Sequence, residues 1–291
     1  MARFDRWLEL LETSFLAAPA IARISLFFAA WVALWLPIAF PLAARLQWQW
    51  GTPLAPHQKL SLVASLYLLA PLVLYGAQQV EGSTWADLGL LWNYQTLGSA
   101  GLGLGLGALG IGVLFGVQRS LGWIGWQWQP DGPSLGRALA SVVLPTLVLG
   151  SWVSLTEEAI FRGFLLNQLQ TDYGFWLSAA IASLIFAVLH LVWDPWRETG
   201  PQVPGLWLMG MILVVARWAN GGNLGLAIGL HAGWIWAMAT LDTLQCIHYT
   251  DRVSPWLTGL GNKPLAGATG LLFLAGTGAV IWRLGLSDFL F

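Results

Sequence analysis

Long runs of apolar residues dominate the chain and decide its fold class. A bilayer core about 30 Å thick is crossed by a helix of about 20 apolar residues. Eight stretches reach or approach that length: residues 24–44, 60–80, 88–118, 138–156, 173–193, 205–216, 224–241 and 264–282. Each span must be helical, because lipid cannot satisfy an open sheet edge. The pattern predicts an all-α, polytopic transmembrane bundle of seven or eight spans, of which the sixth is short unless it begins near Thr199.

The segment before the first span has a different pattern. Apolar residues recur there at helical spacing with charged residues between them: Phe4, Trp7, Leu8, Leu11 and Phe15. This pattern predicts an amphipathic helix, which lies at the membrane interface or packs against the bundle. The first long apolar run starts only after Arg23, and no short apolar region with a cleavage site precedes it, so we expect no cleavable signal sequence.

Composition excludes several classes of protein. Charged residues make up 9% of the 291 residues and apolar residues 57%, whereas soluble domains carry about 25% charged residues. The chain also holds 20 tryptophans, which favour membrane interfaces. A net charge of -1 gives no electrostatic basis for binding nucleic acid. The single cysteine, Cys246, excludes an internal disulfide.

Residues 101–112 read GLGLGLGALGIG and contain the pattern GxGxxG. A dinucleotide-binding loop with this pattern follows a strand in a soluble unit and has an acidic residue downstream, and neither is present. Glycines within an apolar helix allow two helix backbones to approach closely. We therefore interpret this stretch as a helix-packing surface.

Ionisable residues divide the chain into three parts. Residues 1–137 hold the amphipathic segment and accessory spans without internal charges, residues 138–245 place charged and imidazole groups at membrane depth, and residues 246–291 hold a loop and the final span. A charge at the centre of a membrane helix costs about 2.5–3.5 kcal/mol on insertion scales, so such residues are functional candidates. We expect the chemistry to lie within residues 138–245.

The first group of ionisable residues is Glu157, Glu158 and Arg162. Glu158 precedes Arg162 by four residues, the favourable order for an ion pair on a helix. Glu157 lies about 100° further round the helix and has no local partner. An unpaired carboxylate in a dry site is a candidate general base. The alternative is that these charges end a helix among the lipid headgroups.

Two histidines follow in later spans. His190 stands near the end of its span, with Asp194 one turn further, where it could orient the imidazole. His231 lies among small residues that leave room for another helix or a substrate. In one hypothesis, Glu157 and His190 activate a water that attacks a peptide carbonyl while His231 stabilises the oxyanion. In the other, His190, His231 and Glu157 bind a zinc ion that activates the water.

These motifs resemble a known family. The pattern EExxxR at Glu157–Arg162, FxxxH at Phe186 and His190, and GLHA around His231 are similar to the CPBP family of CAAX proteases and bacteriocin-processing enzymes, also labelled abortive-infection proteins. The resemblance covers residues 138–242. It implies a helical bundle with a conical cavity, a membrane-embedded peptide or protein substrate and a place in a bacterial inner membrane or a thylakoid membrane.

The same resemblance implies roles for the residues. Glu157 would be the water-activating base with His190 assisting it, Glu158 and Arg162 would be structural or substrate-facing, and His231 would belong to the oxyanion hole. The third motif departs from the family at Ile235, where an Asn or Asp is common.

The departure at Ile235 motivates an alternative function. Loss of one oxyanion donor typically costs about 100- to 1,000-fold in rate, so the chain could be a catalytically impaired scaffold or assembly factor. Trp234 and Asn223 are candidate substitutes for the missing donor. A proton-coupled transporter is a third hypothesis, disfavoured because the two halves show no matching motifs.

Overall fold

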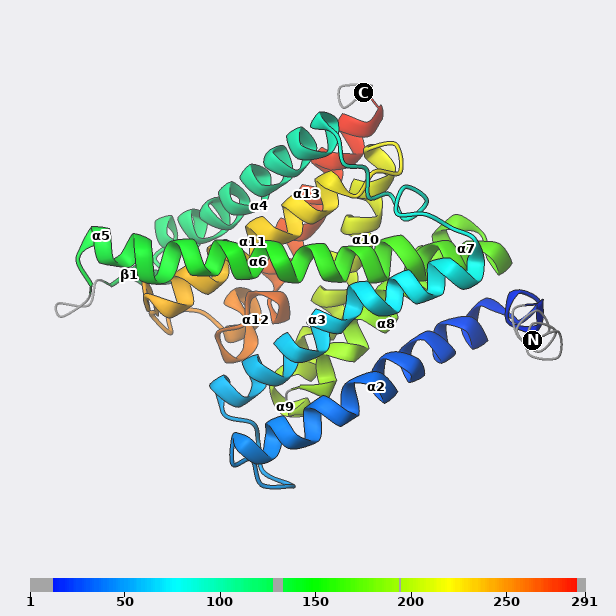
Figure 1. Ribbon diagram of the computed structural model, residues 1–291. Helices are drawn as coiled ribbons and strands as arrows, with labels where there is room; N and C mark the ends of the chain where they lie inside the picture. Colours follow the sequence, from blue (N-terminus) through cyan, green and yellow to red (C-terminus); the bar gives the residue numbers. More distant parts are fainter. Residues whose placement is uncertain (1–12, 128–132, 194, 287–291) are drawn as a thin grey trace.

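A computed structural model of the protein describes residues 13–127, 133–193 and 195–286 as one helical bundle (Figure 1). Its long single helices are α2 (Ala20–Arg45), α3 (Pro56–Glu81), α4 (Tyr94–Ser120), α8 (Phe175–Leu189), α10 (Val203–Ala219), α11 (Gly225–Thr243) and α13 (Ala268–Leu286). Short helices or turns occupy α9 (Trp196–Thr199), α12 (Pro255–Thr258), His190–Val192, Gly200–Gln202, Leu260–Asn262 and Pro264–Ala266.

One further helix is continuous over 38 residues, from Leu135 to Asp172. It comprises α5 (Leu135–Ala138), α6 (Leu144–Glu158) and α7 (Leu166–Asp172), joined by π-helical segments at Leu139–Val143 and Ala159–Leu165. Figure 1 shows this helix crossing in front of α11 and α10. The sequence predicted that the fourth span ends near Thr156. The helix instead continues for 16 residues beyond Thr156, to Asp172. Glu157 and Glu158 therefore lie inside a helix and not at its end.

The transmembrane prediction is confirmed. Within the described residues, seven helices are long and apolar enough to cross a bilayer, and the chain is an integral membrane protein. The sixth stretch qualifies because α9 and the turn after it extend the span back to Trp196, giving Trp196–Ala219. Helix α11, which corresponds to the predicted span 224–241, is not among these seven helices. Glycines and His231 lower its hydropathy, which is tolerated because its N-terminal half is covered by protein and not by lipid.

Glycines allow α11 to approach α4 closely, as the packing interpretation of residues 101–112 predicts. Gly103 and Gly107 on α4 face backbone atoms of Leu226 and Leu230, and a Cβ on Gly229 would lie 2.7 Å from the carbonyl carbon of Ala100. Helix α11 also packs against α6 on its other side. The imidazole of His231 is thereby held inside the bundle, 3% exposed.

A tight turn connects α10 to α11. Gly221 and Gly222 have φ of 62° and 87°, a left-handed conformation that glycine adopts without steric cost. Asn223 fixes the start of α11, because its side chain accepts a hydrogen bond from Gly225 N at 2.7 Å and donates one to Thr96 at 2.6 Å. The turn therefore ties α11 to the first turn of α4.

A small antiparallel sheet lies beyond the membrane-spanning helices. Strand β1 (Ile124–Trp126) pairs with β2 (Ile247–Tyr249), with Gly125 opposite His248. The sheet brings the connection after α4 against the connection after α11. The division into residues 1–137, 138–245 and 246–291 remains a prediction, and most of the predicted amphipathic segment, residues 1–12, lies outside the described residues.

The close contact between α4 and α11 predicts an effect of one added methyl group. Gly229→Ala should destabilise the protein by about 1–3 kcal/mol, the usual cost of overpacking, because the Cβ would meet the backbone of Ala100. The matched control is Gly105→Ala, where a Cβ meets nothing within 4 Å. Thermal unfolding in detergent measures both variants, and equal unfolding temperatures would contradict the packing described.

Candidate active site

A buried network of three ionisable side chains joins α6 to α11. One oxygen of Glu158, Oε1, accepts hydrogen bonds from Arg162 Nη1 at 2.9 Å and from His231 Nδ1 at 2.8 Å. The exposed fractions of the Glu158, Arg162 and His231 side chains are 0%, 1% and 3%. The ion pair expected from the EExxxR spacing is therefore present, and it lies in the interior and not among headgroups.

Arg162 lies in the π-helical segment Ala159–Leu165. Its guanidinium carbon is 4.4 Å from the ring centroid of Phe186 on α8, a cation–π distance. A π-helical turn inside an α-helix disturbs the backbone hydrogen-bond ladder and is frequent at functional sites. Here Arg217 on α10 donates to the carbonyl oxygen of Arg162 and, at 2.9 Å, to the side chain of Asn167. The irregular segment is thus held by a second arginine from a neighbouring helix.

Glu157 points in another direction from Glu158 and has different partners. Its Oε1 accepts a short hydrogen bond from the hydroxyl of Tyr67 on α3. Its Oε2 lies 3.7 Å from Nε2 of His231. The residue is 6% exposed. One carboxylate oxygen is therefore occupied by a phenol, and the other faces the imidazole that Glu158 orients.

The hydrogen bonds assign the ring nitrogens of both histidines. The carbonyl oxygen of Phe186 lies 2.8 Å from His190 Nδ1 and can only accept, so Nδ1 carries the proton and Nε2 of the neutral ring is an acceptor. The carboxylate of Glu158 fixes Nδ1 of His231 as a donor in the same way. Asp194, which was expected to orient His190, lies outside the described residues.

One cavity of about 310 Å³ is lined by Glu157, His190 and His231. We call it the central cavity. The three candidate residues come from three separate helical segments, and the fold brings them to the same space. The ring of Phe186 stands near both imidazoles, with centroids 4.6 Å from His190 and 6.1 Å from His231.

The residue at position 235, where the sequence departs from the family motif, lies in the wall of the central cavity. Ile235 lines the cavity and offers no polar group. Trp234 lines it too, but its indole Nε1 is buried and has no hydrogen-bond partner among the described residues. Asn223 is committed to Thr96 and Gly225 at the start of α11 and is not among the residues that line the cavity.

The described residues do not form a preformed metal site. Among them, no group of three His, Cys, Asp or Glu side chains is close enough to hold a metal ion. The bonds to Nδ1 of His231 and His190 leave Nε2 of each ring as the nitrogen that could bind a metal. The zinc hypothesis for His190, His231 and Glu157 finds no matching donor set in this geometry because the three side chains are not close enough together.

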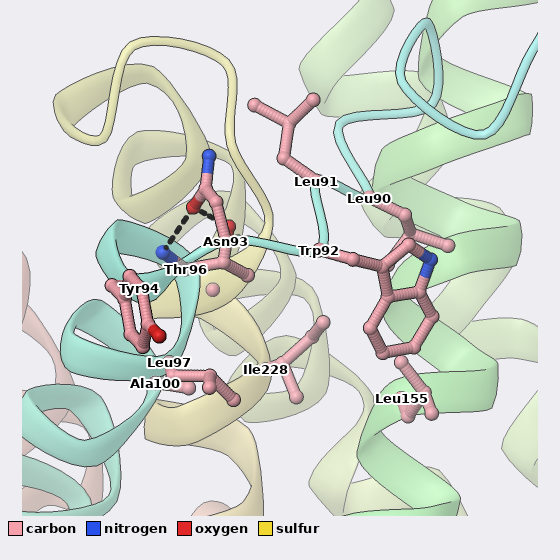
Figure 2. Close-up of a pocket in the computed structure, with 11 residues that line it drawn as sticks. Leu90, Leu91, Trp92, Asn93, Tyr94, Thr96, Leu97, Ala100, Leu155 and Ile228 are labelled. Atoms are coloured by element: carbon pink, nitrogen blue, oxygen red, sulfur yellow. Dashed lines mark hydrogen bonds between the residues drawn. The ribbon is translucent and has the colours of Figure 1, made fainter.

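A larger cavity of about 450 Å³ lies elsewhere, between the loop before α4 and helices α6 and α11. Figure 2 shows Trp92, Leu155 and Ile228 around it, with Asn93 accepting hydrogen bonds from Thr96 at the start of α4. No carboxylate, imidazole or amine is among the described residues that line it. Its lining is mainly apolar, with polar groups from Asn93, Tyr94 and Thr96.

Sequence reasoning missed Tyr67 and Arg217. Both are polar residues within candidate membrane spans, Pro56–Glu81 and Trp196–Ala219. Polar residues at membrane depth usually face the bundle interior and have partners, so this signal was present for each. The partners themselves could not be read from the chain, because Tyr67 lies 90 residues from Glu157 and Arg217 lies 55 residues from Arg162.

Comparison with known proteins agrees with the family resemblance. Residues 139–237 match the family described as Rce1-like, type II CAAX prenyl endopeptidase, and all five candidate residues lie within this range. An Escherichia coli protein described as an uncharacterized 24.3 kDa protein is 34% identical over 97 residues. The alignment covers 33% of this chain and 42% of the relative, so less than half of that relative's length is matched. No solved structure matches the chain.

The buried network predicts a large penalty for removing its cation. Arg162→Met should destabilise the protein by about 3–5 kcal/mol, because it leaves the Glu158 carboxylate buried without its ion-pair partner. The double variant Glu158→Gln/Arg162→Met should recover part of the loss, since it removes both charges. Arg283→Met, at an exposed position near the end of α13, is the control. Thermal unfolding in detergent gives the comparison, and a double variant no more stable than Arg162→Met would contradict the coupling of the pair.

Proposed function

Because residues 139–237 carry the sequence pattern of the Rce1-like CAAX proteases, we propose that this protein is an intramembrane endopeptidase that hydrolyses peptide bonds of membrane-associated substrates. The observation that carries the proposal is the shared cavity of Glu157, His190 and His231. A membrane interior holds no water of its own to satisfy polar groups. A buried carboxylate and two imidazoles around one cavity make a site where water can be bound and activated.

Glu157 is the proposed general base. With Tyr67 bonded to Oε1, the free oxygen Oε2 accepts a proton from a water in the central cavity. The water oxygen attacks the peptide carbonyl carbon, and a tetrahedral intermediate with one negatively charged oxygen forms. The proton held by Glu157 then passes to the amide nitrogen as the carbon–nitrogen bond breaks, which releases a carboxylic acid and an amine.

His231 is the proposed oxyanion donor. Since Nδ1 donates to Glu158, only the doubly protonated ring can also donate from Nε2. In that form the two nitrogens face two carboxylates, Glu158 at 2.8 Å and Glu157 at 3.7 Å. Glu158 is thus proposed as the residue that orients His231, with Arg162 balancing its charge. His190 has an acceptor nitrogen, Nε2, that can help to hold the attacking water.

We also propose the kind of membrane and the class of substrate. A bacterial inner membrane is supported by the Escherichia coli relative, and a thylakoid membrane is the alternative. The family description suggests a prenylated CAAX peptide as the first substrate to test, beside unmodified membrane-anchored peptides. A scaffold function is the second candidate, and it is favoured by the aliphatic Ile235 in the cavity wall.

Removal of the base should abolish cleavage. In proteoliposomes with prenylated and unmodified peptides, Glu157→Gln should lower kcat by at least about 100-fold, while its unfolding temperature stays near that of the wild type. Tyr67→Phe should have a smaller effect, because it frees Oε1 but leaves the carboxylate in place. Cleavage by Glu157→Gln at the wild-type rate would refute the assignment, and zinc chelation should leave the wild-type rate unchanged.

A donor restored at position 235 separates the protease from the scaffold. Ile235→Asn places an amide in the cavity wall and should raise kcat, by up to about 100-fold if a full oxyanion donor is regained. Ile235→Val changes size without adding a donor and should leave kcat within a few fold. If neither the wild type nor Ile235→Asn cleaves any peptide while Glu157→Gln still complements a deletion strain, the scaffold function is supported instead.

A further inference from the structure

A second, polar cavity adjoins the central cavity along α11. It has a volume of about 300 Å³ and is lined by side chains from four elements, among them Gln127, Asp242, Tyr249 and Asn262. We call it the vestibule. Three residues, Met238, Asp242 and Asn262, line both cavities. The vestibule and the central cavity therefore meet at these side chains.

Helix α11 forms a common wall. His231, Ile235, Met238 and Asp242 are separated by four, three and four residues, so they lie on one face of the helix. At 1.5 Å per residue, His231 and Asp242 are about 16 Å apart along the helix axis. The polar end residues are separated by two apolar ones, Ile235 and Met238. This face of α11 thus lines the two cavities, from the imidazole past two apolar side chains to a carboxylate.

The Asp242 end of this face lies outside the candidate membrane spans. Asp242 and Asn262 are exposed, and the neighbouring sheet of β1 and β2 lies outside the candidate membrane spans. Burial raises the pKa of Tyr249 to about 12, with the charge of Asp242 acting in the same direction, so its hydroxyl stays protonated. A polar cavity of this volume holds several waters, each of which needs two to four polar partners.

We propose that the vestibule is the route by which water reaches Glu157, with Met238 at the constriction between the vestibule and the central cavity. Hydrolysis consumes one water for each bond, and lipid around the spans cannot supply it. Methionine is flexible and adapts its shape, so its side chain can let single waters pass while it excludes lipid tails. The proposal rests on the proteolytic function, because only a hydrolytic site needs this supply.

Cysteine accessibility tests the route without any substrate. Cys246 is the only cysteine in the sequence, so Cys246→Ser provides a cysteine-free background. Single cysteines at Asp242, Met238 and the lipid-facing control Leu109, which is 70% exposed within α4, are treated in nanodiscs with a charged, membrane-impermeant methanethiosulfonate. Nanodiscs expose both membrane faces, so the orientation of the protein does not affect the result. Labelling is followed by mass spectrometry.

Asp242→Cys and Met238→Cys should react at least 10-fold faster than Leu109→Cys. Adding Asp242→Trp to Met238→Cys should slow labelling at least 10-fold, because the indole blocks the vestibule; if that variant fails to fold, Asn262→Trp takes its place. A rate for Met238→Cys equal to that of Leu109→Cys, or a rate that the tryptophan leaves unchanged, would overturn the route.

The two proposals fail in different ways. Expected labelling combined with no cleavage of any peptide would leave the vestibule as a water path and refute the protease. Cleavage that Glu157→Gln abolishes, together with unlabelled Met238→Cys, would keep the protease and refute this route.

Discussion

The carboxylate of Glu158 lies fully buried between a guanidinium on its own helix and an imidazole on α11. Two charges removed from water lose solvation worth several kcal/mol each, and their mutual attraction offsets this loss only when the geometry is good and further hydrogen bonds are made. Glu158 Oε2 and Arg162 Nη2 are buried without a hydrogen-bond partner among the described residues. Glu158 Oε1 gains its further hydrogen bond from His231 Nδ1, and the guanidinium of Arg162 lies over the ring of Phe186. The helix from Leu135 to Asp172 and α11 can therefore pack stably in one register, the register that joins Glu158 to His231.

That register gives two adjacent glutamates different surroundings. Glu158 faces the arginine and Nδ1 of His231, whereas Glu157, about 100° round the helix, faces Tyr67 and the central cavity. Two neighbouring carboxylates in one dry pocket would repel each other. The helix geometry separates them: Glu158 is paired with Arg162, and Glu157 lines the central cavity. The π-helical segment that follows is held from outside by Arg217.

Segments outside residues 139–237 complete the site. Tyr67 on α3 donates a hydrogen bond to the candidate base, and the residues that line the central cavity include Lys263, Leu265 and Phe273 from the last part of the chain. The α4 glycines that admit α11 also lie outside the family segment. The family segment thus supplies the buried network of Glu158, Arg162 and His231, and the flanking segments complete the wall of the central cavity.

The sequence alone determined the membrane class, the helical spans and the ion pair of Glu158 and Arg162. Each depends on local properties of the chain. These are the length of an apolar run, the high cost of unpaired backbone polar groups in lipid, and the spacing of two residues on one helix. It also picked out His190 and His231 as unusual at membrane depth. That all three motifs line one cavity was an inference from their resemblance to a family.

Only the tertiary structure decided which side chains meet. Tyr67 and Glu157 are 90 residues apart, and Glu158 and His231 are 73 residues apart, distances over which periodicity carries no information. The tertiary structure also decided that the N-terminal half of α11, with its low hydropathy, is covered by protein. A single chain shows what each helix can bury, but which neighbour satisfies a buried polar group depends on how all the helices pack together.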